Sequence, residues 1–202
     1  LLPYQRYKSS AKDYCITNLR RFVMPIREIA VSNFKSFRDL QFSPDNFNII
    51  IGSNASGKSN LIQVFKFIRD IAKYGLNNAI SLQGGVEYLR NTIIGPAMPF
   101  AFRIVYVLEE KRADVIGVKD GLPVYFEPYE IKYEFALTFP DSGESYEISI
   151  DLLTVSGNFC HSGASGIHQL GAGTLTLSRV DGSVAYCVCP PGGLELKDLD
   201  LF

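Results

Sequence analysis

The sequence has no excess of either charge and no apolar run long enough to span a bilayer. Its 20 lysines and arginines face 21 aspartates and glutamates, which leaves a formal net charge of −1. That balance gives no general electrostatic reason to expect binding to nucleic acid or to a membrane surface. No signal peptide is visible either. We therefore expect a cytoplasmic protein with no membrane partner.

Cysteine is also scarce, and its four positions do not form a disulfide pattern: Cys15, Cys160, Cys187 and Cys189. This usage is typical of a protein from a reducing compartment. Three of these cysteines could be combined with His161 and His168 into a zinc site. However, the Cys-x-Cys spacing is not a usual pair of zinc ligands. We expect small buried or edge residues at these positions instead.

The most informative stretch that is present runs from Gly52 to Ser59. It reads Gly-Ser-Asn-Ala-Ser-Gly-Lys-Ser and fits the P-loop pattern of glycine, four residues, glycine, lysine and serine or threonine. The apolar run 47–51 precedes it and predicts a strand buried on both faces. Gly75 is placed to end the helix expected after it. One face of that helix is predicted to contain Leu61, Phe65, Ile68 and Ala72.

Each residue type in this stretch has a role in binding phosphate. The glycines allow close approach of the backbone, and the N–H groups of the loop form an anion cradle at the positive end of the helix dipole. Lys58 is the candidate catalytic residue, because it would reach the β- and γ-phosphates, and the Ser59 hydroxyl would coordinate Mg²⁺. The residues expected to bind the nucleotide are Gly52, Ser53, Asn54, Ala55, Ser56, Gly57, Lys58, Ser59 and Asn60.

The rest of the chain is dominated by strand patterns. Two short strands are predicted to pair within 26–42, and another strand is predicted at 100–108, followed by a loop or hairpin up to residue 121. Clean alternation predicts an antiparallel hairpin from 130 to 152. The glycine-rich stretch 156–173 is interpreted as a mobile loop, and 174–188 as a hairpin turning at Asp181-Gly182.

These patterns predict an α/β fold in which a mixed sheet surrounds the P-loop strand and helix. We interpret 1–23 as an upstream or weakly ordered lead and 24–202 as one lobe. Within that lobe, 24–108 would form the P-loop core and 123–189 an antiparallel β-meander layer.

A resemblance to a known superfamily rests on two stretches. Asn33-Phe34-Lys35-Ser36-Phe37 ends the first strand, and 52–62 reads Gly-Ser-Asn-Ala-Ser-Gly-Lys-Ser-Asn-Leu-Ile. Together they resemble the N-terminal signature of the ABC-type ATPase heads of RecF, the structural-maintenance-of-chromosomes proteins and the overcoming-lysogenization-defect nucleases. Ala55 stands where glycine is more common. No heptad run follows the helix, so the chain is most similar to the compact AAA-type ATPases of this group.

The resemblance implies ATP rather than GTP as the nucleotide, and Mg²⁺ as its metal. It also implies that Lys35 lies near the nucleotide, although a solvated lysine at a strand end is an equal alternative. The family's heads dimerise with ATP between them. A homodimer, with DNA or an effector as further partner, is therefore expected by analogy alone.

Hydrolysis in these heads needs a Walker B strand ending in Asp and Glu and a Ser-Gly-Gly signature, and neither is present here. The run 104–110 ends in two acids but has Glu109 where Asp is expected. We therefore expect a C-terminal lobe encoded beyond residue 202.

Two functions follow from this reading. The first is an ATPase that is complete in the full-length dimer, and the alternative is a nucleotide-gated dimerisation or interaction module without meaningful turnover. A GTPase is disfavoured, since no Asn-Lys-x-Asp segment occurs and Asp114-Val115-Ile116-Gly117 follows charged residues instead of a buried strand.

Overall fold

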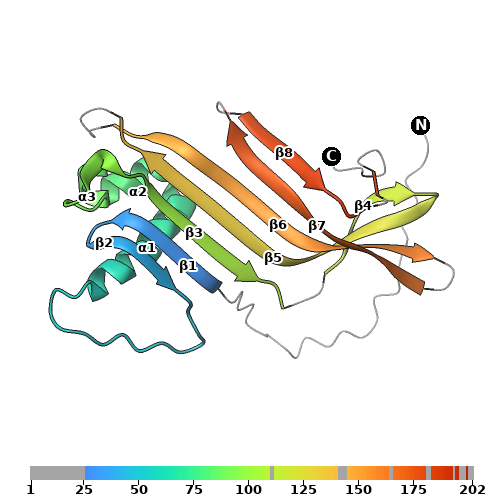
Figure 1. Cartoon of the computed structure of the whole chain (residues 1–202), viewed down its shortest axis with the longest axis horizontal. Helices are drawn as coiled ribbons and strands as arrows, with labels where there is room; N and C mark the ends of the chain where they lie inside the picture. Colours follow the sequence, from blue (N-terminus) through green and yellow to red (C-terminus); the bar gives the residue numbers. More distant parts are fainter. Residues whose placement is uncertain are drawn as a thin grey trace.

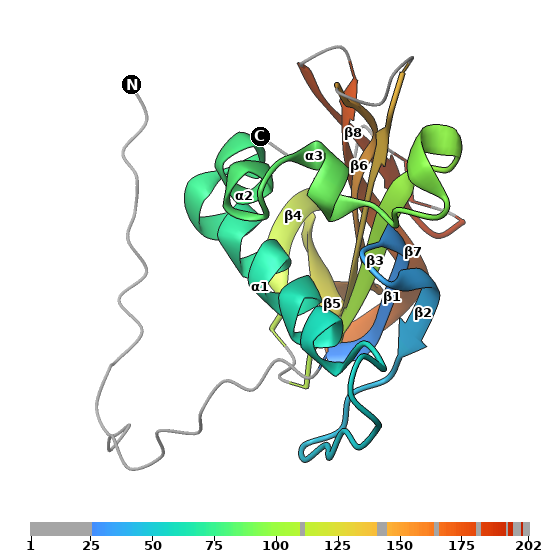
Figure 2. The same cartoon turned by 90° about the vertical axis from the view of Figure 1, so that its left-hand side faces the viewer.

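The computed structural model describes residues 26–109, 112–140, 145–163, 166–180, 183–192, 194–195 and 199. One long, twisted antiparallel sheet carries helices at one end, on one of its faces (Figures 1 and 2). The strands are β1 (Ile26–Phe34), β2 (Phe37–Phe42), β3 (Phe100–Val107), β4 (Asp114–Lys119), β5 (Leu122–Thr138), β6 (Glu147–Gly163), β7 (Gly166–Val180) and β8 (Ser183–Cys189). The helices are α1 (Lys58–Tyr74), α2 (Leu76–Leu82), α3 (Val86–Leu89) and the 3₁₀ turn η1 (Gly95–Ala97).

The strand order is β2-β1-β3-β5-β6-β7-β8. Strand β4 pairs with the N-terminal part of β5, residues 122–126. Paired residues share a face of the sheet, so the register produces continuous rows of side chains. One such row crosses the sheet through Phe42, Ile29, Ile104, Tyr133, Leu153, Leu177 and Tyr186. The alternation in the sequence therefore gives the sheet one apolar face.

The first hydrophobic core lies where α1 covers that face. The rings of Phe34 on β1, Phe67 on α1 and Phe100 on β3 are all buried and contact one another, with centroid distances of 5.6 to 6.2 Å. Aromatic groups in such tilted and edge arrangements contribute a large buried area. This core fixes α1, and with it the glycine-rich loop that precedes α1, against β1 and β3.

A second, smaller core lies at the other end of the sheet. It contains Val124, Phe126, Phe159, Val188 and Leu194, with the rings of Phe126 and Phe159 only 4.9 Å apart. The long strands β5, β6 and β7 reach from one core to the other (Figure 1).

Several predictions from the sequence are confirmed. The α/β class, the paired strands within 26–42, the strand beginning at Phe100 and the end of α1 at Gly75 are all observed. The excursion after β3 is the β4–β5 hairpin, and the two later hairpins are β5–β6 and β7–β8. The predicted lead 1–23 and the turn residues Asp181 and Gly182 lie outside the described residues.

The predicted strand 47–51 is wrong. This segment is an irregular connection between β2 and α1 (Figure 1), and Phe47 and Ile51 are 79% and 89% exposed. The mixed sheet expected around it is therefore not observed, because all pairings between the described strands are antiparallel. An apolar run shows that a segment favours burial, but a strand also needs a neighbour, and none of the described strands pairs with 47–51.

The predicted helix face is confirmed at Leu61, which is buried, and at Ile68, which is partly buried against the first core, but it is wrong at Phe65 and Ala72. The buried residues of α1 are Leu61, Val64, Phe67 and Asp70, whereas Phe65 and Ala72 are exposed. The predicted and the buried residues both have helical spacing, and packing against the sheet buries the set that contains Phe67. In the described part of the chain, no helix is long and apolar enough to cross a membrane.

The glycine-rich stretch 156–173 is not a loop, since most of it forms β6 and β7. Its glycines make room for aromatic rings of the second core. A Cβ at Gly157 would lie 2.5 Å from the Phe126 ring, and one at Gly173 would lie 2.6 Å from the Phe159 ring. Glycine in a strand often marks such a close approach, which composition alone does not distinguish from a flexible loop.

Candidate phosphate-binding site

The P-loop sequence forms a tight turn that leads directly into α1. Ala55 and Gly57 both have left-handed backbone conformations, with φ of 65° and 92°. The first helical bond runs from the N–H of Leu61 to the carbonyl of Gly57 at 3.0 Å, and no side chain caps the helix. The first turn also contains no acidic residue. The free N–H groups and the helix dipole therefore present a positive end to an anion.

A side chain at either motif glycine would crowd its neighbours. A Cβ at Gly52 would lie 2.6 Å from Ser56 Oγ. At Gly57 it would lie 3.1 Å from Ser36 Oγ and 3.2 Å from the Phe37 ring, in a conformation that already disfavours side chains. The loop is therefore packed against the turn between β1 and β2.

Lys58 points back into its own loop. Its Nζ donates hydrogen bonds to the carbonyls of Gly52 at 2.7 Å and Ser53 at 2.6 Å, and lies 3.4 Å from Ser56 Oγ. The ammonium thus already lies inside the turn, where it would meet a bound phosphate. Ser59 is exposed in the first turn of α1, so its hydroxyl is accessible to a metal ion.

The turn between β1 and β2 connects the P-loop with α3. The side-chain amide of Asn60 donates to Ser36 Oγ at 2.6 Å. On the other side of the turn, the Lys35 N–H donates to the carbonyl of Leu89 at 3.0 Å, and Lys35 Nζ donates to the carbonyl of Tyr88 at 3.3 Å. Partial burial lowers the pKa of Lys35. Its proximity to the nucleotide stays a prediction.

A buried asparagine holds this turn in place. Asn33 is fully buried in a left-handed conformation, and its amide donates to the carbonyls of Gly95 at 3.1 Å and Met98 at 2.6 Å. Its Oδ1 accepts the N–H of Asn91 at 3.0 Å. The backbone groups of Asn91, Gly95 and Met98 thus anchor the β1–β2 turn, against which the P-loop packs.

The residues 54–60 together line a pocket of about 450 Å³. A larger hollow of about 720 Å³ lies between α1 and α2, lined by side chains such as Lys66 and Asn78. Volume does not decide between the two hollows. Only the first combines an uncapped helix N-terminus with a lysine directed into the loop.

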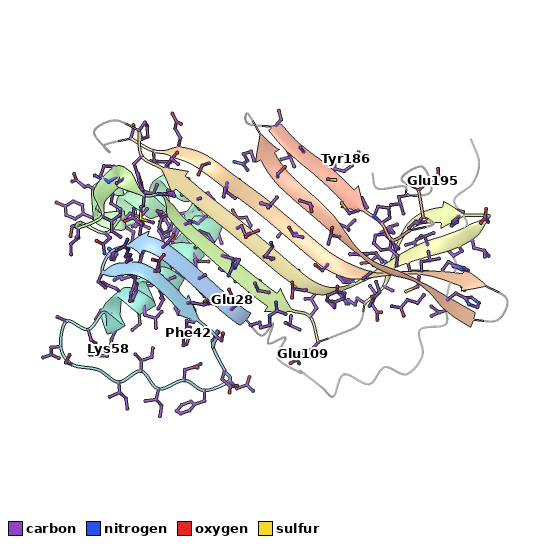
Figure 3. All side chains as sticks on the ribbon, in the orientation of Figure 1. Glu28, Phe42, Lys58, Glu109, Tyr186 and Glu195 are labelled. Atoms are coloured by element: carbon purple, nitrogen blue, oxygen red, sulfur yellow. The ribbon has the colours of Figure 1, made fainter. Side chains whose placement is uncertain are left out.

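The structure therefore brings together the residues predicted from 52 to 60, and it adds Ser36, which the sequence reasoning did not select. The sequence did offer a signal for Ser36, because it is a small polar residue at the bend within Asn-Phe-Lys-Ser-Phe. Glu109, the first of the two acids in the Walker B-like run, lies well away from Lys58 (Figure 3). Asp114, of the GTPase-like segment, begins strand β4 at the opposite end of the sheet (Figure 1).

The cysteine and histidine residues do not form a metal site in the described ranges. Cys187 and Cys189 are exposed on β8, while Cys160 is buried on β6. His161 and His168 face each other across β6 and β7 as a ring pair with centroids 5.2 Å apart.

Comparison with known proteins agrees with this geometry. The family model of the AAA ATPase domain matches residues 24–139, which is more than half of the chain and includes the whole P-loop. The chain belongs to this family. AAA ATPase domains bind and hydrolyse ATP, usually with Mg²⁺, so nucleotide binding is the general activity of this domain.

Two curated proteins are similar to this AAA ATPase domain over short stretches. Endonuclease GajA of Bacillus cereus (strain VD045) is 34% identical over 58 residues, which cover 28% of the chain and 10% of GajA. Chromosome partition protein Smc of Methanococcus voltae is 41% identical over 64 residues, which cover 31% of the chain and 5% of Smc. The matched stretches thus cover a tenth or less of either relative. Both similarities fit the RecF- and SMC-like group that the motif resembles.

Proposed function

We propose that residues 24–202 form the P-loop lobe of an ATPase that binds ATP and Mg²⁺ through residues 52–60. The observation that carries this proposal is the uncapped N-terminus of α1, preceded by a turn in which Ala55 and Gly57 are left-handed and Lys58 points inward. Backbone N–H groups in such a turn favour the phosphate oxygens, and a lysine adds a full positive charge.

Lys58 has the central role in this proposal. Its ammonium is held by two carbonyls and lies near one hydroxyl of its own loop. A β- or γ-phosphate would compete for the ammonium with a stronger, charge-assisted interaction. Ser59 would supply a hydroxyl ligand to Mg²⁺, which in ATPases neutralises charge on the phosphates. Gly52 and Gly57 would keep the cradle free of side chains.

We also propose that a second lobe completes the catalytic machinery. Two exposed apolar groups support this idea: the segment 47–51 and the outer side of α1, where Ile62 is 53% exposed. Both flank the P-loop in the sequence. A covering lobe would bury them and could supply the acidic and signature residues that activate water.

In the complete protein, we propose head-to-head homodimerisation and coupling of hydrolysis to DNA or to an effector. Support comes from the resemblance and from the two relatives, one named as an endonuclease and the other as a chromosome partition protein. A cytoplasmic location is proposed from the scattered cysteines, since Cys160, Cys187 and Cys189 are not joined in disulfides.

A second candidate function is a nucleotide-gated module that binds ATP without turnover. The separation of Glu109 from Lys58 favours it for this chain taken alone, because that acid cannot activate water at the P-loop (Figure 3). The ATPase and the nucleotide-gated module would use the same binding site, but only the ATPase would release phosphate.

The test is titration of the chain with ATP and Mg²⁺ by calorimetry, with phosphate release measured in parallel. Lys58→Ala is expected to weaken binding by about 100-fold, as follows from the loss of roughly 2.7 kcal/mol of charge-assisted hydrogen bonding. Lys66→Ala, an exposed lysine on the same helix, is the matched control and should bind as the wild type does. Equal affinities of the Lys58→Ala variant and the wild type would refute the site. Binding without phosphate release would favour the second candidate.

A further inference from the structure

The sheet has an edge at β8 that differs from its other edges. The strand order ends at β8, so among the described residues this strand has a neighbouring strand on one side only, β7. Tyr186 on β8 lies at the upper border of the sheet in Figure 3. Val184 and Tyr186 are 64% and 60% exposed. Edge strands offer backbone N–H and C=O groups to other strands, and proteins usually protect them.

The other edges carry such protection. Strand β2 contains Arg38 and Asp39, and charges on an edge discourage pairing. Strand β4 begins with Asp114, ends with Lys119 and has a register shift after Val115. In contrast, β8 reads Ser-Val-Ala-Tyr-Cys-Val-Cys, with no charge, no proline and no register shift against β7.

The register of the β7–β8 hairpin determines which backbone groups of β8 point outward. Val180 and Ser183 pair across a two-residue connection, and the residues next to such a connection exchange hydrogen bonds. Odd-numbered residues of β8 therefore point their backbone groups toward β7. The N–H and C=O groups of Val184 and Val188 point to the outside of the sheet.

We propose that β8 pairs antiparallel with β8 of a second copy of this chain, around a two-fold axis at Tyr186. This register places Val184 opposite Val188 of the other copy and Tyr186 opposite its own equivalent. The outward backbone groups of the two strands then face one another. On the other face of the sheet, Ala185 lies opposite Cys187, and Ser183 lies opposite Cys189.

A second copy fits this edge because the strand is complementary to itself. The apolar face, with Val184, Tyr186 and Val188, meets the same apolar face, and small residues meet small residues. The apolar row that crosses the sheet and ends at Tyr186 would continue into the other copy. No charge on β8 is available to select a partner of opposite charge.

This contact is separate from the ATPase-head dimer proposed above and needs no nucleotide. Pairing of two seven-residue edges buries less area than the roughly 1,200 Å² of the smaller stable interfaces. The dimer is therefore expected to be weak and to depend on protein concentration.

Sedimentation velocity over a range of protein concentrations, with a reducing agent and without nucleotide, tests the proposal. The wild type should shift toward dimer as its concentration rises. Val184→Lys should remain monomeric, because a lysine on an edge strand opposes pairing. Val115→Lys on β4 makes the same change at a residue that is 58% exposed, and should dimerise as the wild type does. Circular dichroism checks that both variants are folded.

Further variants separate this edge from the other surfaces. Lys58→Ala should retain the dimer, whereas a dimer that appears only with ATP and is lost in Lys58→Ala would be the head dimer and would overturn the proposal. Ile49→Lys should also retain it. Loss of association in Ile49→Lys but not in Val184→Lys would assign the contact to the exposed segment 47–51. A wild type that stays monomeric at all concentrations would also overturn the proposed β8 dimer.

The register has its own test. In Ala185→Cys, the new thiol would face Cys187 of the second copy in a non-hydrogen-bonded pair, where Cα atoms lie about 4.5 Å apart and a disulfide can form. Mild oxidation should then give a covalent dimer, and adding Cys187→Ser should abolish it. Equal cross-linking with and without Cys187 would overturn the register.

Discussion

The helix-covered end of the sheet and its far end have cores of different construction. At the first end, Phe67 of α1 meets Phe34 and Phe100 of the sheet, so a helix supplies the second layer. At the far end, Phe126 and Phe159 lie on adjacent strands, and glycines provide the space for their rings. The P-loop is attached to the first core alone.

Because of this difference, variants of the two cores should affect nucleotide binding differently. A change in the first core should affect both the fold and the nucleotide site, because α1 carries Lys58 at its N-terminus. A change in the second core should affect the far ends of β5, β6 and β7 while the P-loop keeps its contacts. The comparison can be broken by any variant of the second core that changes nucleotide affinity.

The largest effect is expected from Phe67→Ala. The ring is 1% exposed, and its removal leaves a cavity between α1 and the sheet. The free energy of unfolding should fall by about 3–5 kcal/mol, and nucleotide binding should weaken with it. Phe65→Ala, on the exposed side of the same helix, should change stability by less than about 1 kcal/mol. Urea denaturation of both variants measures the difference, and equal losses would contradict the assignment of the buried face.

A smaller effect is expected from Gly173→Ala in the second core. The added Cβ would lie 2.5 Å from the carbonyl oxygen of Cys189 and 2.6 Å from the Phe159 ring, so the backbone of β7 or β8 must shift. We expect a loss of about 1–3 kcal/mol in unfolding free energy with unchanged affinity for ATP. Gly192→Ala is the control, since no atom lies within 4 Å of its added Cβ. A parallel loss of affinity in Gly173→Ala would show that the two ends are coupled.

The smallest effect is expected at Tyr133, which packs against the first core beside Phe102. Its hydroxyl donates to Asp151 Oδ1 at 2.9 Å, and burial together with this bond raises the pKa of Tyr133. The tyrosine of the unfolded chain ionises near pH 10, so above that pH the folded state binds more protons. The stabilisation is complete below about pH 10 and is lost as the pH rises toward the folded pKa.

Tyr133→Phe should therefore lower stability by about 0.5–1.5 kcal/mol at pH 7 and lose less stability than the wild type above about pH 10. Denaturation at several pH values measures both effects. Tyr129→Phe, at a ring that is 41% exposed, should leave stability at pH 7 unchanged. An identical alkaline slope in the wild type and Tyr133→Phe would contradict the raised pKa.

Features that depend on adjacent residues could be predicted from the sequence. The P-loop turn, the start of α1 after Gly57 and its end at Gly75 follow from glycine positions and local hydrogen bonds. The β5–β6 hairpin follows from strict alternation along Glu130–Thr138, because a strand places successive side chains on opposite faces.

The errors arose where a segment's partner is remote in the sequence. The run 47–51 has the composition of a buried strand, yet its burial depends on a neighbour. The glycines near 157 and 173 suggested a loop, because the sequence did not show that β5 places the Phe126 ring beside Gly157 and that β6 places the Phe159 ring beside Gly173.

The sequence by itself determined the P-loop turn, the resemblance to the family and the β5–β6 and β7–β8 hairpins, because each is specified by residues within a few positions of one another. Only the tertiary structure decided which face of α1 is buried, that Ser36 meets Asn60, and that β8 is an edge. Those features depend on contacts between segments that are distant along the chain. Their free energy comes from the packing of the whole sheet and not from local preference.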